Sequence, residues 1–124
     1  MSDKKLWIVI SAVSGFTAVA IGAFGSHGLK DSLSSEMLEV YKTGVFYHLI
    51  HSVVLLGLSL NTLIKAKFPS IFIVLGIILF SFSLYIYSTS GIRLFAMITP
   101  LGGFCFLIGW LLLIYEAIRV KKAN

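Results

Sequence analysis

The chain has 124 residues, of which 58% are hydrophobic and only 12% are charged, and its formal net charge is +5. So few charged side chains cannot cover the surface of a water-soluble domain of this length, which excludes an ordinary soluble protein. The basic residues lie in short segments between long apolar runs, and no basic groove with interleaved aromatic residues is present, so no nucleic-acid partner is predicted. The composition instead indicates one membrane domain, residues 1–124, whose partner is the lipid bilayer.

Charged residues divide the chain into four apolar runs, at about residues 6–25, 44–64, 69–90 and 94–116. Each run is long enough to cross the hydrocarbon core as a helix, which takes about 20 residues. A helix also satisfies its own backbone hydrogen bonds inside lipid. Because the later runs are joined by short connections, consecutive helices are expected to be antiparallel neighbours. The sequence therefore predicts an all-α membrane protein, an antiparallel four-transmembrane-helix bundle.

The connection between the first two runs is long enough to form structure of its own. Leu29, Leu33, Met37 and Tyr41 recur at helical spacing, and the polar residues fall mainly between them. This pattern is typical of a helix that lies at the membrane surface with its apolar side in the lipid. We therefore expect a short amphipathic interfacial helix at about residues 32–43.

The distribution of lysine and arginine predicts the orientation of the spans. Seven of the ten basic residues lie at the two chain ends and between the second and third runs: Lys4, Lys5, Lys65, Lys67, Arg119, Lys121 and Lys122. The other three, on the opposite side, are Lys30, Lys42 and Arg93. Because cytoplasmic segments carry the excess of basic residues, both termini are expected in the cytoplasm. The first run also resembles a secretory signal peptide, but it is longer than usual signals and is expected to remain as a span.

Small residues within the runs are expected to serve helix packing. Ser14, Ala18 and Gly22 repeat every four residues in the first run, and such a stripe lets another helix approach closely. The glycines expected to do the same in the fourth run are Gly102, Gly103 and Gly109. Pro100 lacks a backbone donor and is expected to bend the fourth helix.

Ionisable and hydroxyl side chains within the spans are the candidates for a functional site. His48 and His51 are three residues apart, so they share one side of the second helix near its outer end. Such residues in a membrane usually face the protein interior. Because the outer ends of all four helices meet in an up-down bundle, we predict a shared polar cluster of His27, His48, His51, Tyr85 and Thr99.

Three uses of these histidines compete. They form hydrogen bonds between helices, or they bind a ligand such as a metal, haem or quinone, or they carry protons or solute across the membrane. Zinc prefers four ligands, and three histidines without an available cysteine are too few, so no metal site is predicted. No motif for catalysis is present, so neither enzyme activity nor a catalytic residue is predicted. No cofactor is predicted, although a bound lipid is compatible with the sequence.

Several short motifs occur in a defined order along the chain. They are Gly22-Ala23-Phe24-Gly25-Ser26-His27-Gly28-Leu29-Lys30, Tyr47-His48-x-x-His51, Ser83-Leu84-Tyr85, Thr99-Pro100-x-Gly102-Gly103 and Gly109-Trp110. This set resembles the small membrane proteins catalogued as domain of unknown function number 423, which are similar to transmembrane protein 256 of animals. The resemblance implies a multi-pass protein of the bacterial cell (inner) membrane, or of a mitochondrial type, and implies no activity. The chain departs from this pattern at two positions. Ser26 stands where Ala is expected, and Phe82 stands where Gly is expected. With Phe82 in place of Gly, the third helix is expected to pack less closely here than in the relatives.

Three hypotheses for function follow. The leading one is a non-enzymatic protein that forms a homo-oligomer or is accessory to a larger membrane complex. The first alternative is a small oligomeric channel or transporter for an ion, a proton or a small solute, which uses the histidines of the second span. The second alternative is a protein that binds a membrane lipid or cofactor in the outer cluster.

Overall fold

The computed structural model describes residues 1–121, and every regular element in this range is helical. The elements are α1 (Asp3–His27), α2 (Ser35–Leu60), α3 (Lys67–Gly76), the π-helical η1 (Ile77–Phe82), α4 (Ser83–Ser90) and α5 (Arg93–Arg119). α3, η1 and α4 follow one another without a break and form one rod, Lys67–Ser90. This rod, α1, α2 and α5 are each long and apolar enough to cross a membrane. The predicted all-α membrane fold is therefore confirmed.

Polar or flexible residues mark the helix ends. Ser2 caps α1 by accepting a hydrogen bond from the backbone of Lys5, and Ser34 caps α2 by accepting one from Met37. The rod ends at Gly91, whose φ of 72° lies in the left-handed region that glycine adopts without strain. These residues set where the chain turns between the spans.

The structure differs from the sequence-based expectation in the segment 32–43, which is not a separate interfacial helix. α2 runs without a break from Ser35 to Leu60, so most of this segment is the first part of the second span. Tyr41, Gly44 and His48 are all buried, and their spacing keeps them on one side of a single helix. The Tyr41 hydroxyl donates to a backbone carbonyl of α1 at 2.5 Å. Most of the segment 32–43 therefore forms the first turns of α2, which Tyr41 packs against α1, and not a separate helix at the membrane surface.

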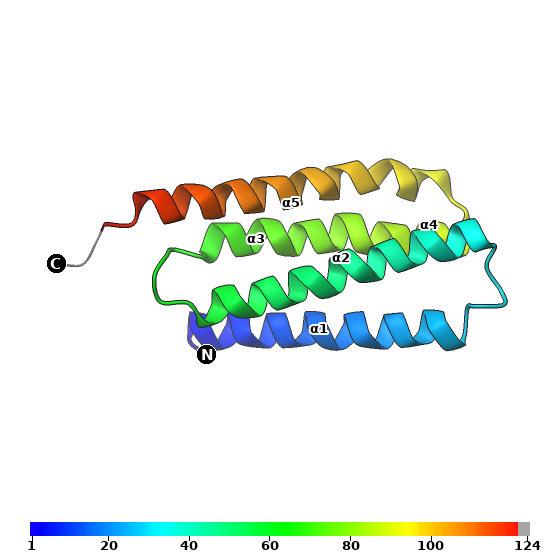
Figure 1. Ribbon diagram of the computed structural model, residues 1–124, viewed down its shortest axis with the longest axis horizontal. Coiled ribbons are helices and arrows are strands. Elements are labelled where there is room, and N and C mark those ends of the chain that lie inside the picture. Colours follow the sequence, from blue (N-terminus) through cyan, green and yellow to red (C-terminus); the bar gives the residue numbers. More distant parts are fainter. Residues whose placement is uncertain (122–124) are drawn as a thin grey trace.

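The helices are antiparallel to their neighbours in the chain and pack in chain order. Figure 1 shows α1 and α5 on opposite sides of the molecule, with α2 and the α3–η1–α4 rod between them. Within residues 1–121, close backbone contacts join α1 to α2, α2 to the rod and the rod to α5, and none joins α1 to α5. The start of α1, the end of α5 and the α2–α3 connection lie at one end, called the terminal end below (Figure 1). The other end, called the loop end, holds the α1–α2 and α4–α5 connections.

The small residues of α1 face α2. Ser14 bonds to a serine of α2, Ala18 is 0% exposed, and a Cβ atom on Gly22 would lie 3.1 Å from a valine of α2. A Cβ atom on Gly25 would overlap the ring of Tyr41. This stripe is therefore used for packing within the chain.

Glycines of α5 allow it to lie close to the rod. A Cβ atom on Gly102 would overlap the backbone of Phe80 in η1, so the two helix backbones touch at this point. A Cβ atom on Gly109 would lie 2.9 Å from the side chain of Ile73. Gly103 is more open, since its nearest neighbour is the Phe80 ring, 3.9 Å from the position of a Cβ atom. Close approach strengthens dispersion between the helices, which matters because lipid supplies little hydrophobic drive.

Candidate functional site

His48 lies in the interior, between α1 and α4, and is only 1% exposed. Its Nδ1 atom is 2.9 Å from the Tyr85 hydroxyl, and its Nε2 atom is 3.3 Å from the Thr17 hydroxyl. The Thr17 hydroxyl also lies within hydrogen-bonding distance of the carbonyls of Val13 and Ser14. A carbonyl oxygen can only accept, so the hydroxyl donates its single proton to these carbonyls. Thr17 therefore accepts from Nε2–H, and Nδ1 accepts from Tyr85. A neutral imidazole protonated at Nε2 fits these partners.

A chain of hydroxyls continues from His48 towards α1. Ser52 donates to the His48 carbonyl at 2.7 Å, and the Ser14 and Ser52 hydroxyls are 2.6 Å apart. Since the Ser52 proton is used on the carbonyl, Ser14 donates to Ser52. The Phe82 ring packs against both His48 and Tyr85, with its centroid 5.3 Å from that of His48 and 5.4 Å from that of Tyr85. Phe82 thus fills the space beside the cluster, where the family resemblance implied a glycine.

His51 is 5% exposed and faces α5 rather than α1. Its Nδ1 atom is 2.7 Å from the Tyr47 carbonyl, which can only accept, so Nδ1 carries the proton. Its Nε2 atom accepts from the indole N–H of Trp110 at 3.2 Å. The imidazole also stacks on the Phe106 ring at a centroid distance of 3.8 Å. His51 is therefore a neutral imidazole, and its tautomer is the opposite of the one that fits the partners of His48.

The other two members of the predicted cluster lie apart from the histidines. Thr99 bonds to the hydroxyl of Ser83 at 2.7 Å and joins α5 to α4 near the loop end. Its hydroxyl also donates to the Phe95 carbonyl at 3.1 Å. Thr99 directly precedes Pro100, and the bend of α5 that is expected at Pro100 stays a prediction. His27 is exposed in the last turn of α1, beyond the point where Tyr41 packs on this helix. The structure therefore brings His48 and Tyr85 into direct contact, places His51 and Thr99 in separate bonds, and leaves His27 outside.

Two partners of the histidines were not identified from the sequence. Thr17 follows Ser14 by one helical turn, which is a weak signal, because threonine is common in apolar helices. Trp110 gave a stronger signal, since tryptophan in membrane proteins is enriched at the interfaces and this one lies well inside α5. A tryptophan at that depth needs a partner for its N–H.

A cavity of about 420 Å³ lies beside His51, between α2, η1 and α5. Its walls are mainly aromatic and include Tyr47, His51, Phe80, Phe104, Phe106 and Trp110. Phe104 is 62% exposed, so the cavity opens on a surface that contacts lipid. Both nitrogens of His51 are already bonded, so the cavity offers ring faces rather than a free ligand atom. It suits an apolar chain or a flat ring better than a charged molecule. Within residues 1–121, no three His, Cys, Asp or Glu side chains are grouped as a metal site requires.

Comparison with known proteins identifies the family. The family described as "Protein of unknown function (DUF423)" matches residues 21–103. The inner membrane protein YgdD of Escherichia coli K12, described as UPF0382, is 38% identical over 123 residues, which cover 96% of this chain and 94% of the relative. The UPF0382 membrane protein YwdK of Bacillus subtilis is 37% identical, over 93% of this chain and 98% of the relative. A UPF0382 membrane protein of Haemophilus influenzae is 37% identical, over 96% of this chain and 98% of the relative.

No solved structure matches the chain. The family match extends from the end of α1 to the middle of α5 and includes both histidines of α2 and the Gly102–Gly103 pair. The relatives cover nearly the whole chain, and their descriptions all refer to a membrane protein. The chain therefore belongs to the DUF423 family of integral membrane proteins.

Proposed function

We propose that the chain is a non-enzymatic membrane protein that works within a homo-oligomer or a larger membrane complex, and that its polar cluster holds the helices together. One observation carries this proposal: both ring nitrogens of His48 and of His51 are bonded within the protein. A histidine that acts as a base or a ligand needs a free nitrogen directed at its substrate or metal. Here the bonds instead connect α2 to α1, to the rod and to α5.

The arrangement of the helices supports assembly with further chains. Among residues 1–121, α1 has close backbone contacts only with α2, and α5 only with the rod, so each has a long side without such contacts. Large apolar side chains cover these sides, including Phe16 at 75% and Ile118 at 79% exposure. Lipid covers such surfaces in an isolated chain, and helices of another subunit cover them in a complex. The small-residue stripe of α1 already packs on α2, so assembly is expected through these larger side chains.

The orientation belongs to the same proposal. Five of the basic residues that the structure describes at the terminal end are Lys4, Lys5, Lys65, Lys67 and Arg119. The positive-inside rule then places the terminal end in the cytoplasm and the loop end outside. The description of the Escherichia coli relative refers to the inner membrane, and we extend that location to this chain.

Native mass spectrometry of the protein extracted from its own membrane in mild detergent tests the proposal. We expect masses that correspond to several copies, or to one chain with a partner. The same sample in a harsh detergent provides the monomer reference. A single chain alone in mild detergent, from membranes that were never exposed to harsh detergent, would contradict the assembly.

Binding of a membrane cofactor or lipid is the second candidate, and the aromatic cavity beside His51 favours it. A bound quinone or haem would give an absorption spectrum that the pure chain lacks, and solvent extraction would release it. A channel or transporter has less support, because neither buried histidine has a free nitrogen to accept a proton. Flux through proteoliposomes that disappears in a His48→Ala, His51→Ala double variant would favour the channel instead.

A further inference from the structure

A second cavity, called the basic groove, lies at the terminal end and has a volume of about 730 Å³. It lies between the connection from α2 to α3 and the last turns of α5. The connection contributes Leu63, Ile64 and Lys65, and α5 with its extension contributes Tyr115, Arg119 and Lys121. Unlike the cavity beside His51, the basic groove combines apolar side chains with several charges.

The charge of the groove is positive. Lys65, Arg119 and Lys121 line it together with a single acidic residue, Glu116. Glu116 is already paired, because its Oε2 atom accepts from Nε of Arg119 at 2.8 Å. The groove therefore has an excess of positive charge where the helices leave the hydrocarbon core.

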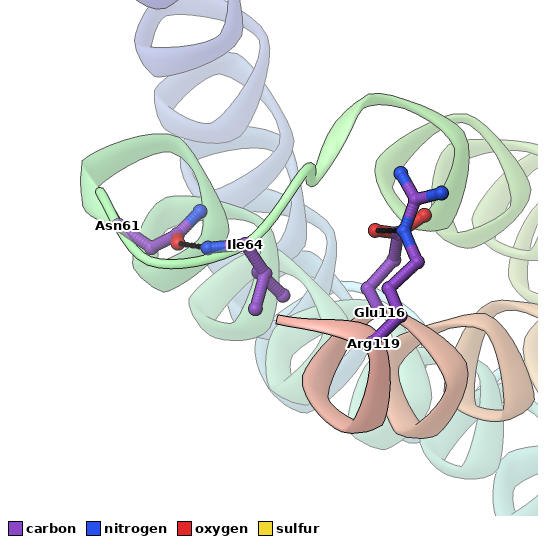
Figure 2. Close-up of polar contacts among 4 residues, drawn as sticks. All are labelled: Asn61, Ile64, Glu116 and Arg119. Atoms are coloured by element: carbon purple, nitrogen blue, oxygen red, sulfur yellow. Dashed lines mark hydrogen bonds and ion pairs between the residues drawn. The ribbon is translucent and has the colours of Figure 1, made fainter. Parts of the chain in front are cut away.

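Arg119 is held in place from two sides. The Glu116 side chain is only 11% exposed, so its carboxylate is a fixed anchor, and the guanidinium also lies 5.5 Å from the centre of the Tyr115 ring. Figure 2 shows the bond to Glu116 at Nε of Arg119, and no bond is drawn from the two terminal nitrogens to the carboxylate. Since the bond to Glu116 uses Nε, the N–H groups of the terminal nitrogens remain for a second, two-pronged bond to an anion.

The opposite wall of the groove is also fixed. The Asn61 side chain accepts hydrogen bonds from the backbone N–H groups of Leu63 and Ile64, both at 2.8 Å, and donates to the Leu58 carbonyl at 2.9 Å. These bonds hold the start of the connection in one shape, and Figure 2 shows the bond from Ile64 to Asn61. Lys65 follows directly, so its position along the wall is set by this turn.

We propose that the basic groove binds the phosphate group of an anionic phospholipid. Arg119 makes the two-pronged contact with the phosphate oxygens, and Lys65 and Lys121 add charge on either side. The groove lies at the ends of two spanning helices, at the depth of lipid head groups. Its lining includes Leu63 and Ile64, and Leu63 is 73% exposed. These side chains suit the glycerol and first acyl carbons of a lipid, which a soluble phosphate does not have.

The test uses the full chain in nanodiscs that contain equal amounts of phosphatidylglycerol and phosphatidylcholine, followed by release into native mass spectrometry. We expect the wild-type chain to retain phosphatidylglycerol preferentially. The double variant Lys65→Gln, Arg119→Gln should lower this preference about tenfold or more, because it removes the two-pronged, charge-assisted contact of Arg119 with the phosphate and the charge of Lys65 beside it. Glutamine is chosen at position 119 because its amide still donates to Glu116.

The matched control is the double variant Lys4→Gln, Lys5→Gln, which removes the same charge at the same end without touching the groove. Its preference should fall clearly less than that of the groove variant, because both double variants lose the same general attraction to the anionic surface but only the groove variant loses the contacts with the phosphate. Equal losses in the two double variants, or no loss in the groove variant, would overturn the site. If Arg119→Gln prevents folding, Lys65→Gln with Lys121→Gln decides, since both residues are exposed and neither touches Glu116. Loss of the retained lipid on addition of inorganic phosphate would overturn the assignment to lipid in favour of a free anion.

Discussion

Trp110 of α5 donates its indole N–H to Nε2 of His51 of α2, at 3.2 Å. The bond connects residues far apart in the chain and fixes the protonation of the imidazole, because an indole N–H cannot accept a hydrogen bond. It joins α5 to α2 directly across the rod that separates them in chain order. The stability of the helix packing and the chemistry of the histidine therefore depend on one contact.

The first prediction concerns the tautomers. His51 should carry its proton on Nδ1, because its partners are a carbonyl and an indole N–H, and His48 should carry its proton on Nε2, the arrangement that fits its two hydroxyl partners. Nitrogen-15 NMR of selectively labelled histidine distinguishes protonated from unprotonated ring nitrogens. The variants His48→Asn and His51→Asn assign each signal. A doubly protonated ring at neutral pH in either residue would contradict the bonding pattern.

The second prediction concerns the indole bond itself. Trp110→Phe keeps an aromatic ring against His51 but removes the donor that its Nε2 has in the described part of the chain. We expect a loss of about 0.6–1.7 kcal/mol in the free energy of unfolding, the range for hydrogen bonds between membrane helices. Unfolding in mixed micelles measures it. Trp7→Phe is the matched control, because within residues 1–121 the Trp7 indole makes no hydrogen bond; an equal loss there would show that ring size alone matters.

The third prediction concerns the contact between α5 and η1. Gly102→Ala places a methyl group where the backbone of Phe80 lies, so the helices must separate. We expect a loss of about 1–3 kcal/mol or more, as for other overpacked contacts. Gly57→Ala is the control, since a Cβ atom there meets nothing within 4 Å. The comparison fails if the two variants unfold at the same denaturant concentration.

The fourth prediction concerns orientation. In a Cys105→Ser background, Lys30→Cys lies at the loop end and Lys65→Cys at the terminal end, and both positions are exposed. A maleimide that cannot cross the membrane should label position 30 in intact cells and position 65 only after permeabilisation. The reverse pattern would place the termini outside.

The sequence predicted the spans because their signal is strong: long apolar runs between charges leave no other structure stable in lipid. It also identified the buried pair His48 and Tyr85, since polar residues in a span face the interior. It could not show that residues 32–43 belong to α2, because an amphipathic pattern looks the same whether lipid or a neighbouring helix covers its apolar side. His27 lies outside the polar cluster because Tyr41 packs on α1 before the helix reaches His27. The spacing of residues along the chain does not show where Tyr41 packs.

The π-helical segment η1 has a consequence for how the rod presents its two halves. A stretch of wider winding accommodates an extra residue, so the helix after it is rotated relative to an uninterrupted α-helix. The rotation per residue of an α-helix is about 100°, which is enough to move a side chain from one neighbour to the next. In α3 the buried Ile73 packs in the apolar core beside α5, and in α4 Tyr85 reaches His48 of α2. Deleting one residue within Ile77–Phe82 would restore regular winding and turn Tyr85 away from His48, while α3 kept its contacts. The π turn thus lets α4 reach α2 as well as α5, whereas α3 packs mainly on α5.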